Sequence, residues 1–264
     1  MSNNNLIPNL RLNETNEFNG DLAQLRFLRE HKGDPQNLLS HLKMRFGIIY
    51  TMIVLSGLSL ILLIVYPDLD IKFSEFFYSS SAGFIYQKNP IVLFVFQATP
   101  IATKIFLVIC LSYILFNLIQ NKGLKKTILS STFYLVITIA VGPGLIVNYI
   151  LKDHFGRARP SQITYFHGTK EFAPAFSISN QCNTNCSFSS GHAAISYYYT
   201  SLAYIVSSIY FIRIYSSFII FGSIVGFTRI LMGGHFLSDV IASCFIILII
   251  NHLFFLLWQK LRST

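Results

Sequence analysis

The chain has 264 residues, of which 53% are hydrophobic and 12% charged, and its formal net charge is +9. Ordinary soluble domains contain about twice that share of charged residues, so the composition excludes a soluble globular protein, and we expect no nucleic-acid partner. It indicates instead an all-α, polytopic membrane protein surrounded by the lipid bilayer.

Residues 1–43 precede the first long apolar run and are predicted to form a cytoplasmic segment. Its first part, "MSNNNLIPNLRLNETNEFNG", is polar and predicts disorder. From Asp21 to Lys43, apolar residues recur at helical spacing on both sides of "GDP", which predicts two short amphipathic helices that lie on the membrane surface or pack against the domain. The segment contains no apolar signal core, so we expect the first span to remain as an anchor.

Residues 44–264 are predicted to form one domain, a bundle of six transmembrane helices. A bilayer core about 30 Å thick requires roughly 20 apolar residues per helix. Only Arg213–Tyr215 separates the fourth run from the fifth, and Ile91–Phe96 either lengthens the second run or lies in the interface. The six predicted spans are Phe46–Tyr66, Ile101–Leu118, Thr127–Ile150, Ala193–Ile212, Ser216–Met232 and Val240–Trp258.

The positive charges predict the topology, because Lys and Arg in short loops are retained in the cytoplasm. An even number of spans places both termini on one side, which we therefore expect to be cytoplasmic. The opposite side receives Pro67–Pro90 and Leu151–Ser190, and cations in the second of these segments suggest that an anion binds there. The predicted cytoplasmic cations are Lys43, Arg45, Lys122, Lys125, Lys126, Arg213, Lys260 and Arg262.

Four cysteines divide into two pairs. Cys110 and Cys244 lie inside predicted spans and are interpreted as packing residues. Cys182 and Cys186 flank "NTN" on the non-cytoplasmic side, where an oxidising environment favours a short disulfide over two free thiols. Zinc is disfavoured because nearby histidines lack a standard ligand spacing, so we expect no metal and no cofactor.

Three polar segments fall on the non-cytoplasmic side: "KDHFGRARP", "SSGH" and "RILMGGHFLSD". Each has a structural interpretation when taken alone. Lys152 and Arg159 can be interfacial cations, Ser190 can cap a helix, and His235 with Asp239 can be a structural pair. Their occurrence at the same membrane face favours a common site instead.

Together these segments predict an anion site. Lys152, Arg159 and Arg229 supply cationic donors, while Ser190 and Gly191 lie at a helix N-terminus, where a hydroxyl and free backbone N–H groups bind anions.

Two histidines accompany this anion site. If the sixth helix begins near Gly234, His235 and Asp239 share a face, and the carboxylate accepts the Nδ1 proton and leaves Nε2 free. The other histidine, His192, lies at the helix mouth, and one of the two can attack phosphorus while the other protonates the leaving oxygen.

The order and spacing of these residues resemble the three-part signature of the type 2 phosphatidic acid phosphatase superfamily. The pattern is Lys-x(6)-Arg-Pro, then Ser-Gly-His, then Arg-x(5)-His-x(3)-Asp, and it covers about the second half of the chain besides the six-span layout. Ser189 stands where the family usually has Pro, and Thr228 where it usually has Ser. The matching residues are Lys152, Arg159, Pro160, Ser190, Gly191, His192, Arg229, His235 and Asp239.

The resemblance implies metal-independent hydrolysis of a phosphate monoester or pyrophosphate through a phosphohistidine on His235. His192 would be the general acid and Asp239 would orient His235, while His154 matches no motif position and is interpreted as a loop residue. The groups expected to hold the phosphoryl oxygens are Lys152, Arg159, Ser190, Gly191 and Arg229.

A site at the membrane boundary predicts a lipid phosphate as substrate and partner. The stretch "FAPAFSISNQCNTNCSFSSGH" is similar to bacterial lipid A phosphatases, so we expect lipid A hydrolysis in a bacterial inner membrane, with the site facing the periplasm. Undecaprenyl pyrophosphate and phosphatidylglycerophosphate are alternative substrates. A protein that binds or transports phospholipid without hydrolysis is the alternative of another class, and a vanadate-dependent haloperoxidase is disfavoured because those enzymes are mainly soluble.

Overall fold

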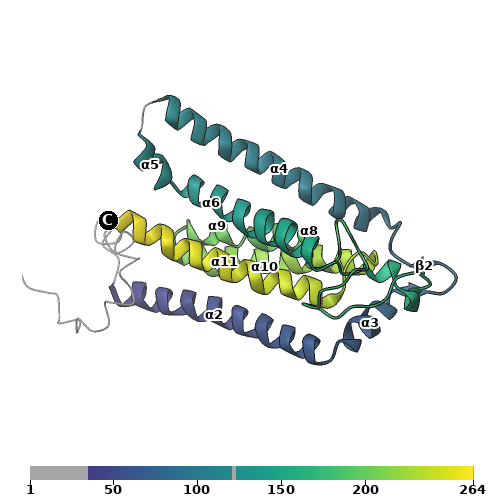
Figure 1. Ribbon diagram of the computed structural model, residues 1–264. Coiled ribbons are helices and arrows are strands. Elements are labelled where there is room, and N and C mark those ends of the chain that lie inside the picture. The colour runs from purple at the N-terminus through teal and green to yellow at the C-terminus, as the bar shows by residue number, and fades with distance from the viewer. Residues whose placement is uncertain (1–34, 121–122, 264) are drawn as a thin grey trace, which may run out of the picture.

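The computed structural model describes residues 35–120 and 123–263, which form an elongated helical bundle with one small hairpin (Figure 1). The hairpin pairs β1 with β2 in antiparallel register, Tyr78 opposite Phe84. The elements are α2 (Pro35–Val65), α3 (Asp68–Glu75), β1 (Tyr78–Ser79), β2 (Gly83–Phe84), α4 (Pro90–Ile119), α5 (Leu124–Ile128), α6 (Ser131–Ile139), the π-helix η2 (Ala140–Leu151), α7 (Lys152–His154), the 3₁₀ turns η3 (Pro160–Gln162) and η4 (Thr164–Phe166), α8 (Gly191–Tyr198), α9 (Ser201–Tyr204), α10 (Ser208–Leu231) and α11 (Leu237–Ser263).

Within the described residues, five helices are long and apolar enough to cross a membrane, judged by length and composition. Their outward faces carry many exposed Leu, Ile, Val and Phe side chains, as expected where lipid rather than water surrounds a helix. Ile91–Phe96 belongs to α4 and so lengthens the second predicted span. The five helices are Lys43–Val65, Pro90–Ile119, Ser131–His154, Ile209–Leu231 and Leu237–Ser263.

The fourth predicted span, Ala193–Ile212, is not one helix. It is divided between α8, α9 and the first turn of α10, and the chain is extended at Ser207, with φ −57° and ψ 143°. Serine competes for backbone hydrogen bonds and favours helix ends over helix interiors. Apolar composition therefore predicted one continuous helix here and did not reveal its break.

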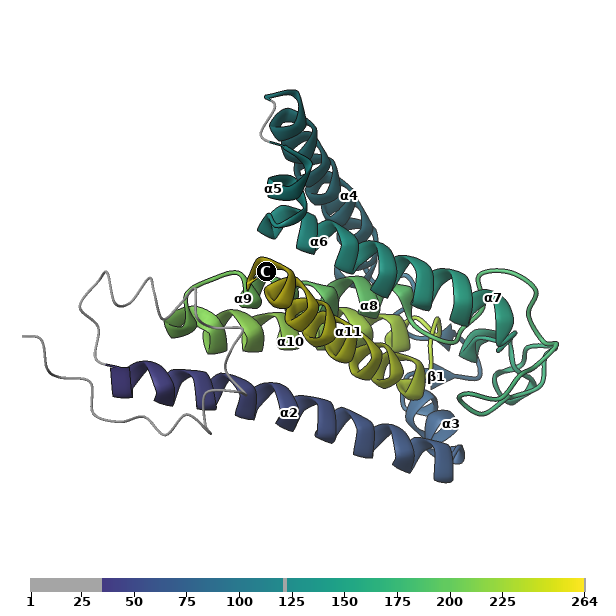
Figure 2. The ribbon, with the colours of Figure 1, turned by 60° about the vertical axis from the view of Figure 1, so that its left-hand side comes forward.

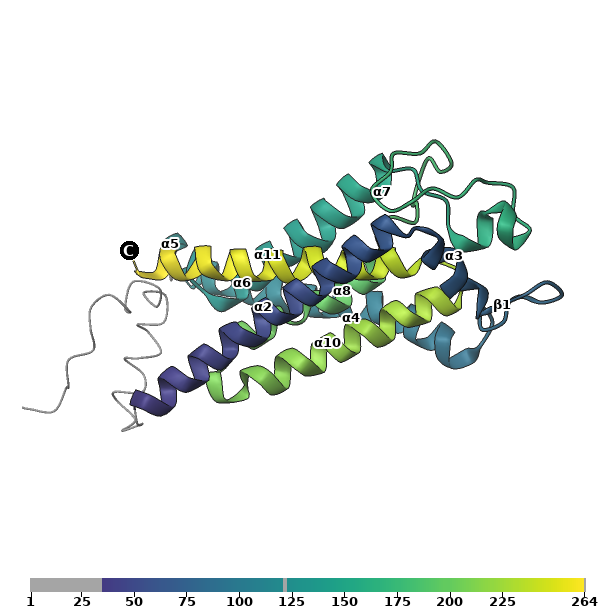
Figure 3. The same cartoon turned by 90° about the horizontal axis from the view of Figure 1, so that it is seen from below.

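Successive long segments run in opposite directions along the bundle (Figure 1). The start of α2 and the end of α11 lie at one end, and α3, the hairpin and the loop of residues 155–190 lie at the other (Figures 1 and 2). In both views α2 and α4 lie on opposite sides of the bundle, and from below α2 lies against α11 (Figure 3). All three polar segments therefore reach the same end, opposite the C-terminus.

The predicted segment 1–43 is only partly described. α2 begins at Pro35 and continues without a break into the first span, so its last residues extend a transmembrane helix. The predictions for residues 1–34 lie outside the described residues.

The core centres on α8, whose Ala193, Ala194, Tyr197 and Tyr198 are buried between α10, α11 and η2. Small alanines allow close packing of helices. This central, buried position fixes the mouth of α8 at the end of the bundle where the polar segments meet.

Candidate active site

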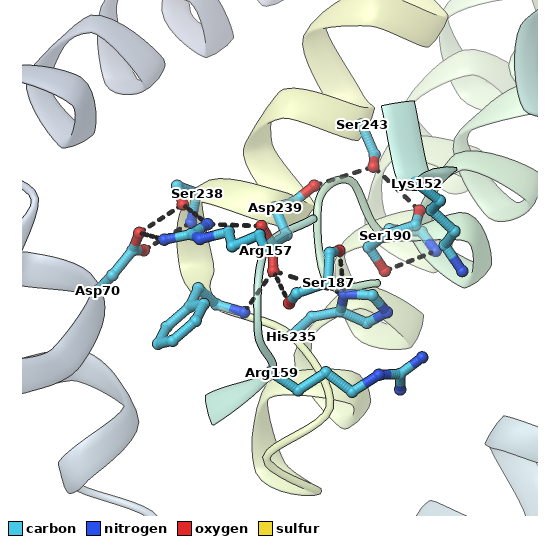
Figure 4. Close-up of polar contacts among 12 residues, drawn as sticks. Asp70, Lys152, Arg157, Arg159, Ser187, Ser190, His235, Ser238, Asp239 and Ser243 are labelled. Carbon is cyan, nitrogen blue, oxygen red and sulfur yellow. Dashed lines mark hydrogen bonds and ion pairs between the residues drawn. The ribbon is translucent and has the colours of Figure 1, made fainter. Parts of the chain in front are cut away.

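A fully buried ionic network lies at the start of α11 (Figure 4). Arg157 places Nη1 2.6 Å from Asp239 Oδ1 and Nη2 2.8 Å from Asp70 Oδ2, and all three side chains have zero exposure. Burial lowers the pKa of Arg157, but Asp239 and Asp70 outweigh it and raise that pKa above its ordinary value. One buried cation thus joins α3 to α11 through two carboxylates.

Serine and backbone groups complete the hydrogen bonds of both carboxylates. Asp239 Oδ2 accepts from Ser187 Oγ at 2.5 Å and from the Phe236 backbone N–H at 2.8 Å. Asp70 accepts from the backbone N–H of Ser238 at 2.8 Å and from its hydroxyl. The carboxylates therefore satisfy N–H groups at the α11 N-terminus, where negative charge is also favoured by the helix dipole.

His235 lies in the turn before α11, since that helix begins at Leu237. Its Nδ1 is 2.8 Å from the Ser187 carbonyl oxygen and 3.5 Å from Asp239 Oδ2. The helix thus begins later than the expected start near Gly234, but Nδ1 still lies within ion-pair distance of Asp239, and the Ser187 carbonyl is the closer partner. Because a carbonyl only accepts, Nδ1 carries the proton and Nε2 keeps a free lone pair.

The imidazole of His235 is neutral at neutral pH. Burial lowers its pKa to about 3, although Asp239 opposes this shift; the positive charges of Arg229 and Lys152 lower it further. A neutral imidazole with one free nitrogen is the form that attacks an electrophile.

Three cations lie near His235 without a carboxylate partner among the described residues. Lys152 Nζ donates to Asn185 Oδ1 at 3.1 Å, and Arg159 Nη2 donates to the Asn185 carbonyl at 2.8 Å. Arg229 Nη1 is 3.1 Å from the sulfur of Met232. In Figure 4, Lys152 and Arg159 extend to the side on which His235 carries its second ring nitrogen.

The positive charges of this group are not balanced locally. Lys152 and Arg159 repel each other, and both repel Arg229. Burial lowers the pKa of Arg159. Such a cluster favours an anion, which would relieve the repulsion.

The "SSGH" segment opens α8 as predicted for a helix mouth. Ser190 is the N-cap and accepts from the Ala193 N–H at 3.4 Å. Two bonds tie this mouth to α11, because Ser190 N donates to the Asp239 carbonyl at 3.3 Å and Ser243 Oγ donates to the Ser190 carbonyl at 2.9 Å.

Two glycines are required by close approach of site side chains. A Cβ on Gly191 would lie 2.5 Å from Asn148 Oδ1 and 3.3 Å from Lys152 Nζ. A Cβ on Gly234 would lie 2.5 Å from Arg229 Nη2. Both glycines thus make room for the polar side chains that form the site.

His192 lies at the same mouth and faces α4. Its ring stacks on Phe96 with centroids 4.7 Å apart, and Arg229 Cζ lies 4.3 Å from the centroid of the same Phe96 ring. His192 Nε2 is buried and has no hydrogen-bond partner among the described residues. The charges of Lys152 and Arg229 act on both His192 and His235, so the two histidines and the cations share one electrostatic environment.

Cys182 and Cys186 are joined by a disulfide, with Cα atoms 5.6 Å apart. Cys110 and Cys244 are free thiols inside α4 and α11. No group of three or more His, Cys, Asp or Glu residues in the described ranges is arranged to hold a metal ion. His154 is exposed, with Nδ1 2.8 Å from the Ile150 carbonyl, and takes no part in the site.

The structure thus gathers the eight residues predicted for catalysis and phosphate binding at one end of the bundle. It also adds residues that the motif spacing did not include. Arg157 is one of the cations of residues 151–190 that suggested an anion site, but no motif position includes it. For Asp70 the available signal was the small number of acidic residues, since Asp and Glu together number 11. The added residues are Asp70, Phe96, Asn148, Arg157, Asn185, Ser187 and Ser238.

Comparison with known proteins places the chain in a family. A sequence model of the PAP2 superfamily matches residues 131–263. A lipid A 4'-phosphatase of Francisella tularensis subsp. novicida (strain U112) is 33% identical over 199 residues, which cover 75% of this chain and 89% of that protein.

Two further relatives match a shorter part of the chain. A lipid A 4'-phosphatase of Rhizobium leguminosarum is 36% identical over 104 residues, 39% of this chain and 45% of that protein. One of Rhizobium etli is 36% identical over 102 residues, 39% of this chain and 40% of that protein. No solved structure matches the chain. The matched family region contains all three polar segments, and the chain belongs to the PAP2 superfamily.

Proposed function

We propose that this protein is a phosphatase of the bacterial inner membrane that hydrolyses a phosphate ester of lipid A at the periplasmic face. The observation that carries the proposal is a neutral, buried His235 with a free Nε2, next to three cations that lack carboxylate partners among the described residues. A nucleophile beside an uncompensated positive cluster suits attack on a dianionic phosphate.

In the first proposed step, His235 Nε2 forms a bond to phosphorus as the bond from phosphorus to the lipid oxygen breaks. His192, protonated once the bound phosphate dianion offsets the charges of Lys152 and Arg229, gives its proton to that leaving oxygen. The phosphohistidine carries a positive imidazole ring, which Asp239 and the Ser187 carbonyl stabilise on the Nδ1 side.

In the second step, water attacks phosphorus and loses a proton to His192. Inorganic phosphate leaves and the lone pair returns to Nε2, so atoms and charges balance over the cycle. Lys152, Arg159 and Arg229 hold the phosphoryl oxygens in both steps, together with the Ser190 hydroxyl and the backbone N–H groups at Gly191. These donors supply the positive charge, so we infer that the reaction needs no added metal ion.

The substrate proposal combines position and relatives. The names of the three relatives state a lipid A 4'-phosphatase, and the site lies at an end of a bundle whose helices are apolar enough to span a bilayer. A lipid whose phosphate lies at the membrane boundary can reach such a site while its acyl chains stay in the bilayer. Undecaprenyl pyrophosphate and phosphatidylglycerophosphate satisfy the same geometry and remain competing substrates.

The topology proposal counts α8 with α9 as one crossing, which makes six crossings and brings both termini to the cytoplasm. Cations near the bundle end that holds the C-terminus support this orientation, among them Lys43, Lys126 and Lys260. Labelling of cysteines introduced at Gln162 and Thr169 tests it. Reaction only with reagent supplied from the cytoplasm would contradict the periplasmic site.

The central experiment measures phosphate release by the purified full chain in detergent from lipid A, undecaprenyl pyrophosphate and phosphatidylglycerophosphate. We expect lipid A to give the highest kcat/KM, and brief mixing with labelled lipid to leave acid-labile, base-stable phosphate on the protein. A protein that only binds phospholipid would release none, and it would have no use for a free His235 Nε2.

A further inference from the structure

We propose that Asn185, held inside the Cys182–Cys186 disulfide loop, is a positioning residue that sets Lys152 and Arg159 for phosphate binding. The inference rests on the proposed phosphate-binding role of these two cations. It assigns a function to the loop, which the three-part motif does not include.

One residue contacts two site cations with two different oxygens. The Asn185 side-chain Oδ1 accepts from Lys152 Nζ at 3.1 Å, and its backbone carbonyl accepts from Arg159 Nη2 at 2.8 Å. Among the described residues, these are the only hydrogen bonds that the two cationic head groups make. The position of both charges therefore depends on where Asn185 lies.

The backbone of Asn185 is suited to this double contact. Its φ is +51°, in the left-handed region that asparagine tolerates better than other residues with a Cβ. Asn185 is exposed, so water competes for its oxygens and the hydrogen bonds alone would fix it weakly. The disulfide closes a loop of five residues around it and restricts this movement.

The same short segment also reaches the nucleophile. Cys186 is fully buried, and Ser187, the next residue, contacts His235 through its carbonyl and Asp239 through its hydroxyl. Asn185 and Ser187 thus flank one disulfide cysteine, with the cations on one side and the histidine on the other. The loop therefore links the position of the two phosphate-binding cations to the position of the proposed nucleophile, His235.

The chemistry of the contact favours a positioning role over charge compensation. An amide oxygen and a carbonyl oxygen orient cations but leave their net charge intact. A side-chain carboxylate at position 185 would pair with Lys152, whose Nζ contacts the Asn185 Oδ1, and would repel a phosphate. Neutral acceptors therefore hold the two repelling cations in place while preserving their attraction for an anion.

Three variants separate these contributions in the full-length protein. Asn185→Gly keeps the left-handed backbone and the carbonyl but removes Oδ1, and we expect KM to rise about 3- to 10-fold, within the range for one hydrogen bond to a charged group that water partly replaces. Asn185→Asp should raise KM more than Asn185→Gly, with kcat changed less than KM. Cys182→Ser combined with Cys186→Ser should resemble or exceed Asn185→Gly.

Asn183 provides the matched control, because it is an exposed asparagine in the same loop. Asn183→Gly and Asn183→Asp introduce the same flexibility and the same charge two residues away, and we expect KM within about twofold of wild type for both. If the Asn185 variants match their Asn183 counterparts, the inference is wrong.

Orthovanadate, a phosphate mimic, makes the inference separable from the proposed function. We expect the affinity for orthovanadate to fall in the order wild type, Asn185→Gly, Asn185→Asp. The affinity is measured as the inhibition constant of lipid hydrolysis or, if no lipid is hydrolysed, as the dissociation constant from thermal shift. Wild-type protein that hydrolyses no lipid on the panel but shows this order contradicts the phosphatase and supports the positioning role. Active wild type with unchanged vanadate affinity in all Asn185 variants retains the phosphatase and overturns the positioning role.

A second measurement needs no substitution. Reductant should raise the KM of wild-type protein toward that of the double serine variant and leave the double serine variant unchanged. Equal response of both proteins to reductant, or no response of the wild type whose thiols are shown to be free, contradicts a role for the loop.

Discussion

Arg157 and Arg159 are separated by one residue, but their surroundings are opposite. Arg157 is fully buried between Asp70 and Asp239, which raise its pKa despite burial. Arg159 donates to a neutral carbonyl, and burial lowers its pKa. The charge of Arg157 is paired with two carboxylates and joins α3 to α11. The charge of Arg159 has no carboxylate partner among the described residues and is available to an anionic ligand.

The same contrast divides the whole site. In the network of Asp70, Arg157, Ser187, Ser238 and Asp239, the one cation pairs with both carboxylates, and every carboxylate oxygen accepts a hydrogen bond. The cluster of Lys152, Arg159 and Arg229 lacks carboxylate partners among the described residues. His235 lies between them, with Nδ1 toward the network. A test of this comparison must therefore separate loss of stability from loss of phosphate chemistry.

The largest effect is expected at His235. His235→Ala should remove turnover and the trapped phosphoenzyme, because the ring nitrogen proposed to attack phosphorus is lost, while vanadate should still bind. Labelled phosphate on the protein after brief mixing with lipid measures this. His154→Ala, at an exposed histidine that takes no part in the site, is the control; phosphoenzyme in His235→Ala would refute the assignment.

The paired variants Arg159→Met and Arg157→Met test the comparison directly. Arg159→Met should lower kcat/KM about 10²- to 10³-fold, a typical cost of one lost transition-state donor, with little change in unfolding temperature. Arg157→Met should lower stability by about 3–5 kcal/mol because it leaves two buried carboxylates without their cation. The unfolding temperature and kcat/KM are measured for both variants. Equal loss of stability in both would contradict the distinction between a structural Arg157 and a phosphate-binding Arg159.

A smaller effect is expected from pH. The pKa of His235 is lowered to about 3 in the folded protein and is about 6.5 when unfolded. The unfolded state therefore binds the proton first as pH falls, so His235 destabilises the fold progressively between pH 6.5 and 3 and has no such effect above pH 7. At pH 5 the loss is about 2 kcal/mol. The unfolding temperature of wild type should fall more from pH 7 to 5 than that of His235→Gln.

The smallest expected effect is that of chelation. EDTA should leave the rate of phosphate release unchanged, because Lys152, Arg159 and Arg229 provide the positive charge at the phosphate. The rate is measured before and after dialysis against EDTA, with Mg²⁺ added back to one sample. Activity lost to EDTA and restored by Mg²⁺ would assign the charge compensation to a metal instead.

The predictability of the site from sequence follows the same division. The meeting of the three polar segments was predictable, because each adjoins a predicted span on the same side of the membrane. The structure brings their residues to one end of the bundle: Lys152, Arg159, Ser190, His192, Arg229 and His235. Asp70 and Asn185 were not predictable, because they meet their partners 87 and 33 residues away, and no periodicity encodes such a contact. The ion pair between Asp239 and Arg157 was not predicted for the same reason, because the two residues lie 82 positions apart.

The fold shows a similar limit. Apolar runs predicted the positions of α2, α4, α10 and α11, because lipid-facing helices must be apolar along their length. They did not predict the break near Ser207, because both sides of the break are apolar. They also did not mark the helix ends, since α11 runs from Leu237 to Ser263 and includes the charged Lys260 and Arg262 beyond the apolar run Val240–Trp258.

The bond between Arg157 and Asp70 has a consequence for the size of the functional unit. The region matched by the family begins at residue 131, whereas Asp70 lies in α3, far upstream. A truncated protein starting at residue 131 would contain every motif residue, but Arg157 and Ser238 would have lost a buried acceptor. The smallest fragment worth expressing must therefore begin before α3, although every residue of the family signature lies in the second half of the chain.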